Sequence, residues 1–215
     1  MLRPIIFNEI FTILLIAGLI IVAIAKLVAP KRFNDFVLVL GNDKYLKIYS
    51  RDQKFFDTFD ALLFGNLILS ISVFCSIIYR LIYDTQSIPY NIMLKLMLSI
   101  GIFILIKVLI ERLIGSLFEI DKLIDQYIFQ KISFKNYLGL LLLPINALLI
   151  YSFKPTINII YSIVLLLLII NIIGLISTLK ANQSLIKNHL FYFILYLCAL
   201  EIVPYIILYK VFIAN

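Results

Sequence analysis

Residues 136–179 read NYLGLLLLPINALLIYSFKPTINIIYSIVLLLLIINIIGLISTL, two long apolar runs separated by Lys154, Pro155 and Thr156. A helix of roughly 20 apolar residues crosses a bilayer core of about 30 Å, so each run is long enough to span a membrane. Proline suits a turn and the first position of a helix. The stretch therefore predicts two membrane-spanning helices joined by a tight hairpin at Lys154-Pro155.

The composition of the whole chain extends this prediction. Of the 215 residues, 63% are hydrophobic and 14% are charged, whereas soluble domains have about 45–50% apolar and about 25% charged residues. We therefore expect an all-α transmembrane helical bundle that forms one integral membrane domain, residues 1–215. Hydropathy predicts six spans, at 10–28, 61–83, 92–110, 136–153, 157–179 and 190–212.

The first apolar run has an alternative interpretation as a cleaved signal peptide, because Arg3 precedes it and Ala23-Ile24-Ala25 resembles a cleavage site. Cleavage would send the many basic residues of segment 31–60 across the membrane, against the positive-inside tendency. We therefore expect the first helix to be retained.

Basic residues are distributed unevenly between the two sides of the predicted bundle. Twelve follow spans one, three and five, and four lie on the other side, so both termini are predicted outside the cytoplasm. The net charge of +7 is then explained by loops that face anionic lipid, and no nucleic-acid partner is expected. The twelve are Lys31, Arg32, Lys44, Lys47, Arg51, Lys54, Arg112, Lys122, Lys131, Lys135, Lys180 and Lys187, and the four are Arg3, Arg80, Lys154 and Lys210.

Two cytoplasmic segments, 31–60 and 111–132, are expected to contain amphipathic interfacial helices. In 31–60, Phe33 and Phe36 begin a helical pattern that Gly41-Asn42 interrupts, which predicts a pair of short helices in the headgroup layer. In 111–132, apolar residues recur every three or four positions, at Leu113, Leu117, Ile120 and Ile124. This second segment either lies on the membrane surface or extends the third span into the cytoplasm. Both segments are also candidate docking surfaces for a cytoplasmic partner.

Four stretches together resemble a Bacteroidota family of small polytopic membrane proteins classified as a domain of unknown function. They are Arg3-Pro4, residues 51–64 (RDQKFFDTFDALLF), residues 127–151 with LLLPINALLIY, and residues 191–210 (FYFILYLCALEIVPYIILYK). The resemblance implies an inner-membrane location in a Gram-negative cell, and the two termini are then expected on the periplasmic side. It implies no activity, substrate or catalytic residue.

Enzyme motifs are scarce in the sequence. His189 is the only histidine, which excludes HExxH, and neither a GxSxG elbow nor a Walker loop is present. Cys75 and Cys198 both lie in apolar runs and suggest neither a disulfide framework nor a metal site. We therefore predict no catalytic, cofactor-binding or metal-binding residues and no cofactor.

The polar residues inside the spans are the candidate functional residues: Glu201, Asn146, Asn171 and Lys107. Glu201 lies about 16 Å into its span, where a carboxylate is unfavourable unless it is protonated, hydrated or paired. We therefore expect Glu201 to be neutral and to face the bundle interior. Lys107 is its nearest candidate partner, at an axial gap of roughly 11 Å.

Several functions are compatible with these residues. The polar cluster can be structural, as hydrogen-bonding contacts between helices. The protein can be a non-enzymatic accessory or scaffold component, bound to the lipid bilayer and to a membrane or cytoplasmic protein partner. The alternative is a small-solute or proton-coupled transporter that uses a midplane polar cluster around Glu201. An intramembrane enzyme is the least favoured reading.

The predicted orientation can be tested with alkaline phosphatase fusions, which are active only outside the cytoplasm. A fusion after Asn215 should be active and a fusion near Lys47 inactive, because the basic segments are retained in the cytoplasm. Phosphatase activity in whole cells is the measurement. The reverse pattern would contradict the orientation.

Overall fold

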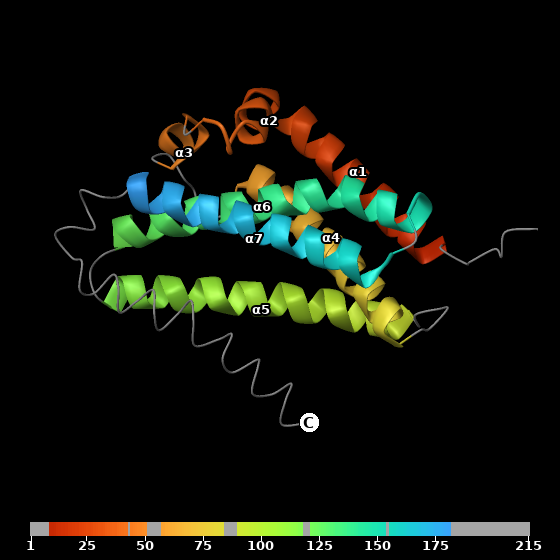
Figure 1. The fold of residues 1–215 in the computed structure, drawn as a ribbon. Coiled ribbons are helices and arrows are strands. Elements are labelled where there is room, and N and C mark those ends of the chain that lie inside the picture. Colours follow the sequence, from red (N-terminus) through yellow and green to blue (C-terminus); the bar gives the residue numbers. More distant parts are fainter. Residues whose placement is uncertain are drawn as a thin grey trace, which may run out of the picture.

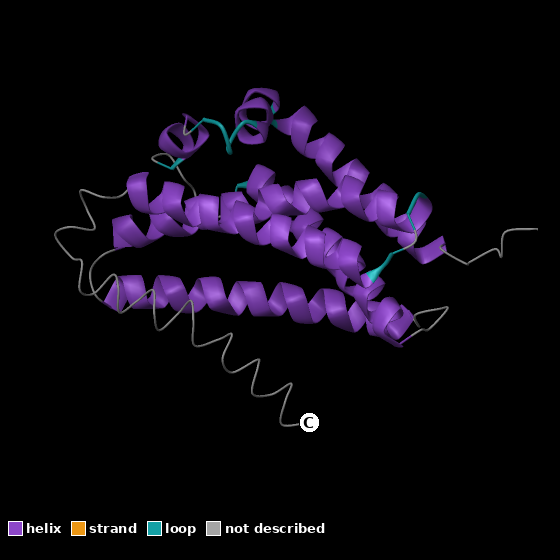
Figure 2. Cartoon of the chain, viewed as in Figure 1, coloured by secondary structure: helices purple, strands orange, loops and turns teal. Residues whose placement is uncertain are grey.

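The computed structural model describes residues 9–42, 44–50, 57–83, 90–117, 121–153 and 155–181. All regular elements within these ranges are helices (Figure 2). In chain order they are α1 (Glu9–Val28), α2 (Pro30–Val37), α3 (Lys44–Tyr49), α4 (Thr58–Tyr83), α5 (Tyr90–Leu117), α6 (Asp121–Tyr151) and α7 (Ile157–Ala181).

Five helices of the described part, α1, α4, α5, α6 and α7, are long and apolar enough to cross a membrane. They overlap the first five predicted spans. The predicted hairpin around Lys154-Pro155 is also confirmed, because α6 ends at Tyr151 and α7 begins at Ile157. The sixth predicted span, 190–212, lies outside the described residues, and a total of six spans stays a prediction.

Helices α4 and α6 form the centre of the bundle. Half of the apolar stretch of each is buried, compared with about a fifth in α1, α5 and α7. The most extensive helix pairing is α4 with α6, and α6 also contacts α1, α5 and α7. Figure 1 shows that α4 and α6 run in the same direction, whereas α1, α5 and α7 run the opposite way. The three outer helices therefore surround a parallel central pair.

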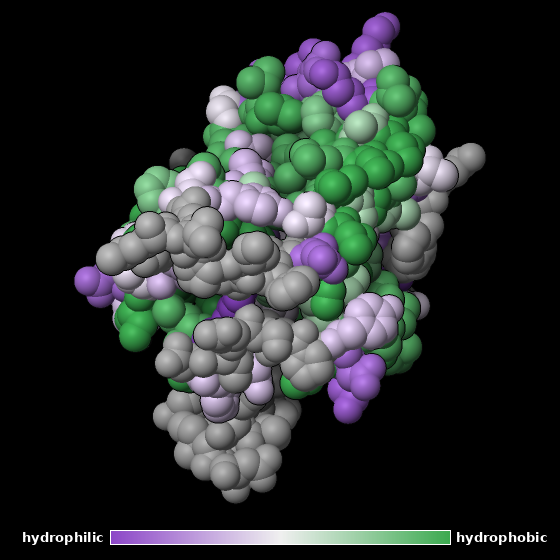
Figure 3. Space-filling model, turned by 90° about the vertical axis from the view of Figure 1, so that its right-hand side faces the viewer, coloured by the Kyte–Doolittle hydropathy of each residue, from purple (hydrophilic) through white to green (hydrophobic). Residues whose placement is uncertain are grey.

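The outer helices expose wide apolar surfaces. Leu98, Ile106 and Leu109 of α5 are exposed, as are Leu165 and Leu168 of α7. Figure 3, which views the bundle from the end away from α2 and α3, shows hydrophobic side chains over much of the upper part of the coloured surface, with hydrophilic ones beside them. Such surfaces suit hydrocarbon, because lipid tails are as apolar as the side chains that meet them.

Glycines allow the helices around α6 to approach closely. A methyl group built on Gly139 of α6 would lie 2.6 Å from the Cα atom of Leu67 in α4. One built on Gly174 of α7 would lie 2.6 Å from the ring of Phe134 in α6. Van der Waals packing at small residues is a main source of helix association in a membrane. The backbone contact at Gly139 therefore sets the spacing of the central pair.

The segment 111–132 is divided between α5 and α6 in the described part, and an interfacial position of this segment stays a prediction. Helix α5 continues to Leu117, in agreement with the extension of the third span, and α6 already begins at Asp121. The two helices meet at Gly115, where an added methyl group would lie 2.9 Å from Ile124. The predicted stripe is therefore divided between two helices: Leu113 and Leu117 are exposed, whereas Ile124 is buried.

The helix that contains the predicted fourth span begins before residue 136. Helix α6 starts at Asp121, and its apolar stretch in the described part reaches back to Ile124. The helix continues through the polar residues there because Ile128, Phe129 and Phe134 pack inside the protein. The boundary of the fourth span within α6 stays a prediction.

The segment 31–60 contains two short helices, as predicted, and they pack on one end of the bundle. Phe33 and Phe36 of α2 and Tyr45 of α3 are buried in a cluster that includes Phe59 of α4 and Phe129 of α6. Val37 and Leu40, which the spacing also assigns to the apolar face, are exposed instead. We call α2 and α3 the cap, and the end of the bundle that they cover the capped end.

The glycine contact at the centre predicts a large effect for a small substitution. Gly139→Ala should lower the free energy of unfolding by about 1–3 kcal/mol, because the new methyl group overlaps the α4 backbone. The measurement is thermal unfolding of the detergent-purified protein.

Gly65→Ala is the matched control, because a methyl group there meets nothing within 4 Å. Alanine is also the better helix former by roughly 1 kcal/mol, so this variant should be as stable as the native protein or more so. Equal destabilisation of both variants would contradict the packing argument.

Candidate functional site

The cap is fixed to the bundle by one arginine. The guanidinium group of Arg32 donates hydrogen bonds to the carboxylates of Asp57 and Asp60 at the start of α4, and the bond from Nη2 to Asp60 Oδ2 measures 2.7 Å. The same group lies 4.7 Å from the ring centre of Phe59 and 5.1 Å from that of Tyr49. Arginine suits this position because it can bind two carboxylates and stack on aromatic rings at once. These contacts join α2, α3 and α4.

Burial and charge both act on the titratable groups of the cap. Burial lowers the pKa of Arg32, but its interactions with Tyr45, Asp60 and Asp57 outweigh the effect of burial, so the pKa is raised. The pKa of Tyr45 is raised by burial and by repulsion from Asp60. At neutral pH the cap therefore contains a charged guanidinium and a neutral phenol, the two states that its hydrophobic surroundings and ion pairs require.

A second ion pair lies inside the capped end. Lys131 of α6 donates a hydrogen bond of 2.5 Å to Glu111 Oε1 of α5, and the Glu111 side chain is 1% exposed. The Lys131 ammonium also lies 5.5 Å from the ring centre of Tyr127. Glu111 Oε2 is buried and has no hydrogen-bond partner within the protein. The pair links the antiparallel helices α5 and α6 near their connection and leaves one acceptor position for a water molecule.

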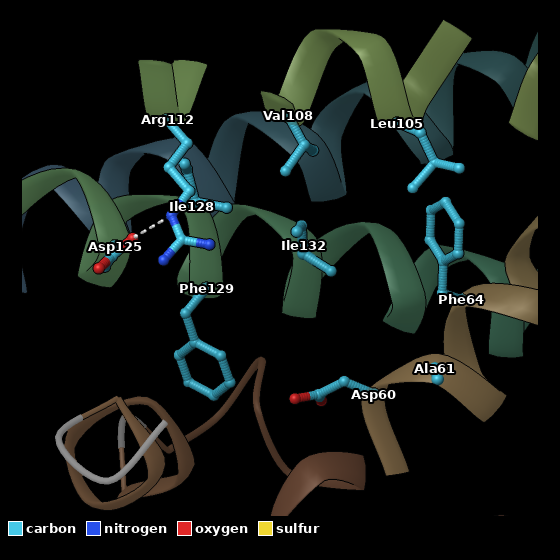
Figure 4. A pocket seen from close by; sticks show the side chains of 10 residues that line it. All are labelled: Asp60, Ala61, Phe64, Leu105, Val108, Arg112, Asp125, Ile128, Phe129 and Ile132. Atoms are coloured by element: carbon cyan, nitrogen blue, oxygen red, sulfur yellow. Dashed lines mark ion pairs between the residues drawn. The ribbon is translucent and has the colours of Figure 1, made fainter. Parts of the chain in front are cut away.

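A cavity of about 130 Å³ opens between α4, α5 and α6 at the same end. Its charged lining residues are Asp60 of α4, Arg112 of α5 and Asp125 of α6, and a carboxylate oxygen of Asp125 lies 3.7 Å from Arg112 Nε. Figure 4 shows the guanidinium of Arg112 directed into the space between the helices, with apolar side chains such as Phe64 and Leu105 along the walls. The cavity therefore has both a charged part and an apolar part.

Three of the sequence-predicted site residues, Asn146, Asn171 and Lys107, lie in the described part of the chain. Asn146 is buried, and its Nδ2 donates to the backbone oxygen of Ser70 across the central pair at 2.8 Å. Asn171 is exposed on α7 and bonds within its own helix, to Leu167 O. Lys107 is 7% exposed and thus lies within the bundle. Glu201 lies outside the described residues, so a cluster around it stays a prediction.

The central pair contains further buried amides that sequence reasoning missed. Asn66 of α4 and Asn136 of α6 are buried, and neither the nitrogen nor the oxygen of either side chain has a hydrogen-bond partner within the protein. Buried polar groups without protein partners are usually satisfied by ordered water. Asn66 lies inside the predicted second span and was the available signal, whereas Asn136 lies at the predicted start of the fourth span, next to Lys135, and gave no signal.

The two ion pairs were also missed. Asp57 and Asp60 lie three residues apart at the start of α4. This spacing places both carboxylates on one helix face and indicates that a cationic side chain lies nearby. This signal was present in the sequence. The pairing of Glu111 with Lys131 had no such signal, because it depends on how α5 and α6 turn against each other.

The fold and the site together define a multi-helix membrane protein whose described part has a capped end and a polar central helix pair. The chain belongs to the DUF4271 family, a domain of unknown function, whose model matches residues 11–212. Neither a curated protein nor a solved structure matches the chain. The resemblance to a family of unknown function is thereby confirmed, whereas its assignment to Bacteroidota stays a prediction.

The contacts of Arg32 predict that one substitution loosens the cap. Arg32→Gln should make limited trypsin digestion within the cap faster and should lower the free energy of unfolding by about 1–3 kcal/mol, because Asp57 and Asp60 lose their charged donor. The measurement combines digestion of the detergent-purified protein with thermal unfolding.

Lys31→Gln is the matched control, because it removes a neighbouring positive charge and one trypsin site from an exposed position. It should leave digestion of the rest of the cap unchanged. If both variants are digested at the native rate, Arg32 does not hold the cap in place.

Proposed function

We propose that this protein is a non-enzymatic accessory or scaffold component of a bacterial inner membrane, and that its cap is the surface on which a protein partner docks. The observation that carries the proposal is the attachment of the cap to the bundle. Arg32 and the buried aromatic residues fix one face of α2 and α3, so the other face has a fixed position relative to the membrane helices.

The outer face of the cap has the composition of a docking surface. Leu38 and Ile48 are exposed there, and so are the basic residues Lys31, Lys44 and Lys47. Apolar side chains surrounded by charged ones are typical of a surface that binds another molecule. A partner with apolar and acidic groups would complement this surface. In the predicted orientation the cap faces the cytoplasm, where such a partner would reach it.

A membrane surface is the main competitor for this face, because basic and apolar residues also suit the headgroup layer. The internal anchoring favours a protein partner. An interfacial helix needs only one apolar face toward the lipid, whereas the most apolar faces of α2 and α3 are directed into the bundle. What remains outside is a mixed surface on which exposed apolar residues such as Leu38 and Ile48 lie among the lysines.

A transport role is the second candidate, and the unpartnered amides of Asn66 and Asn136 favour it, because hydrated polar groups inside a bundle are typical of solute pathways. In that case the residues sensitive to substitution would be these asparagines and Glu201, and variants of the cap surface would retain function. The accessory role predicts the opposite distribution.

Photocrosslinking in native membranes tests the proposed docking. A photoreactive amino acid at Leu38 or Ile48 should give one discrete protein adduct, and Arg32→Gln should reduce this adduct at least about fivefold by displacing the cap. Adducts are measured by gel shift and mass spectrometry.

The same amino acid at Leu98, an exposed position on membrane helix α5, is the control and should label lipid alone. Labelling of lipid alone from Leu38 and Ile48 as well would overturn the docking proposal and assign this face of the cap to the headgroup layer.

A further inference from the structure

The cavity between α4, α5 and α6 has its charged lining residues at one end and its apolar lining residues at the other, and this order is the same on all three helices. On α5, the distance from Arg112 to Leu105 is seven residues, or about 10 Å of axial rise. On α6, Asp125 and Ile132 are separated by the same rise, and on α4 Asp60 precedes Phe64 by about 6 Å. Since α5 runs opposite to α4 and α6, the charged residues all lie toward the capped end and the apolar residues toward the bundle centre.

This polarity matches the depth profile of a bilayer. Helix α6 is about 46 Å long, so it exceeds a hydrocarbon core of about 30 Å and its first residues lie near the headgroups. Asp125 is the fifth residue of α6, and Arg112 lies five residues before the end of α5. The charged part of the cavity thus lies where lipid headgroups lie, and its apolar part lies where acyl chains begin.

The charged groups that line the cavity are one guanidinium, of Arg112, and two carboxylates, of Asp125 and Asp60. Arg112 and Asp125 are 3.7 Å apart, with side chains 42% and 48% exposed, so their pairing is loose and weak. Asp60 is already engaged by Arg32. A ligand with an anion and a neighbouring cation can therefore replace the loose pair, placing its anion on Arg112 and its cation on Asp125.

We propose that this cavity binds the headgroup of phosphatidylethanolamine. The phosphate would accept hydrogen bonds from the guanidinium of Arg112, and the primary ammonium would donate to Asp125. A purely anionic headgroup has no cation for Asp125, and a choline headgroup has no N–H donor. The cavity is smaller than the roughly 300–1,000 Å³ of complete ligand pockets. It therefore holds the headgroup and the first chain atoms, while the acyl chains lie against the exposed surface of α5.

The proposal is independent of docking at the cap, and it can be tested with the full-length protein. The protein is reconstituted into nanodiscs of equal parts phosphatidylethanolamine, phosphatidylcholine and phosphatidylglycerol, then transferred to detergent. Native mass spectrometry measures which lipid stays bound. We expect phosphatidylethanolamine to be enriched about tenfold over each of the other two.

The variant Arg112→Gln with Asp125→Asn should remove this enrichment. The matched control is Asp35→Asn with Lys44→Gln, which removes an exposed ion pair of similar length, 3.4 Å, from the cap. The control should retain the native enrichment. Native-like enrichment in the cavity variant, or equal retention of the three lipids by the native protein, would overturn the proposal.

A second measurement needs no variant and stays informative if the cavity variant unfolds. Successive N-methylation of phosphatidylethanolamine removes the N–H donors one at a time while the phosphate is unchanged. Retention by the native protein should fall with each methyl group. Retention that is unchanged across the series would show that the ammonium group is not recognised and would overturn the assignment.

Discussion

The contact between α4 and α6 is the interaction on which the rest of the structure depends. Its closeness follows from Gly139, which allows the two backbones to meet at Leu67. In a membrane, apolar side chains gain little by leaving lipid for protein, so close packing and polar contacts must supply the attraction between helices. This pair has both, since Asn146 donates to the backbone of α4 next to the glycine contact. The outer helices then pack on a central pair whose relative position is fixed by these contacts.

Charged groups are concentrated at the capped end, and each has a structural reason to be there. Arg32 holds the cap, and Lys131 with Glu111 links α5 to α6 close to their connection. A buried ion pair contributes little net stability, because desolvation of the charges offsets their attraction. Its effect is on specificity: the pair is satisfied in one relative position of the two helices and leaves unpaired buried charges in the others.

The sequence predicts the structural features that depend on the length of an apolar run or on the spacing of nearby residues. Five predicted spans overlap helices of the structure, and the hairpin at Lys154-Pro155 follows from three residues that interrupt a long apolar stretch. The partners of the charged residues cannot be predicted in this way, because Glu111 and Lys131 meet only after α5 and α6 have turned against each other. The depth of a residue along its span also does not predict whether its side chain lies on a buried or an exposed face of the helix. Asn146 and Asn171 have similar predicted depths, yet one is buried and the other is exposed.

The central position of α6 has a consequence for the order in which the bundle is assembled. Helices insert in chain order, so α1, α4 and α5 are in the bilayer before the helix that packs against all three has been synthesised. During this interval α6 does not yet cover its side of α4. Ser72 and Ser76 need no partner from α6, because each donates to a carbonyl of its own helix, at 2.7 and 2.8 Å. Asn66 has no such partner, and its Oδ1 lies beside Gly18 of α1. Insertion of α6 therefore completes the enclosure of an amide that α1 covers on one side, so the close approach at Gly18 matters before the core is complete.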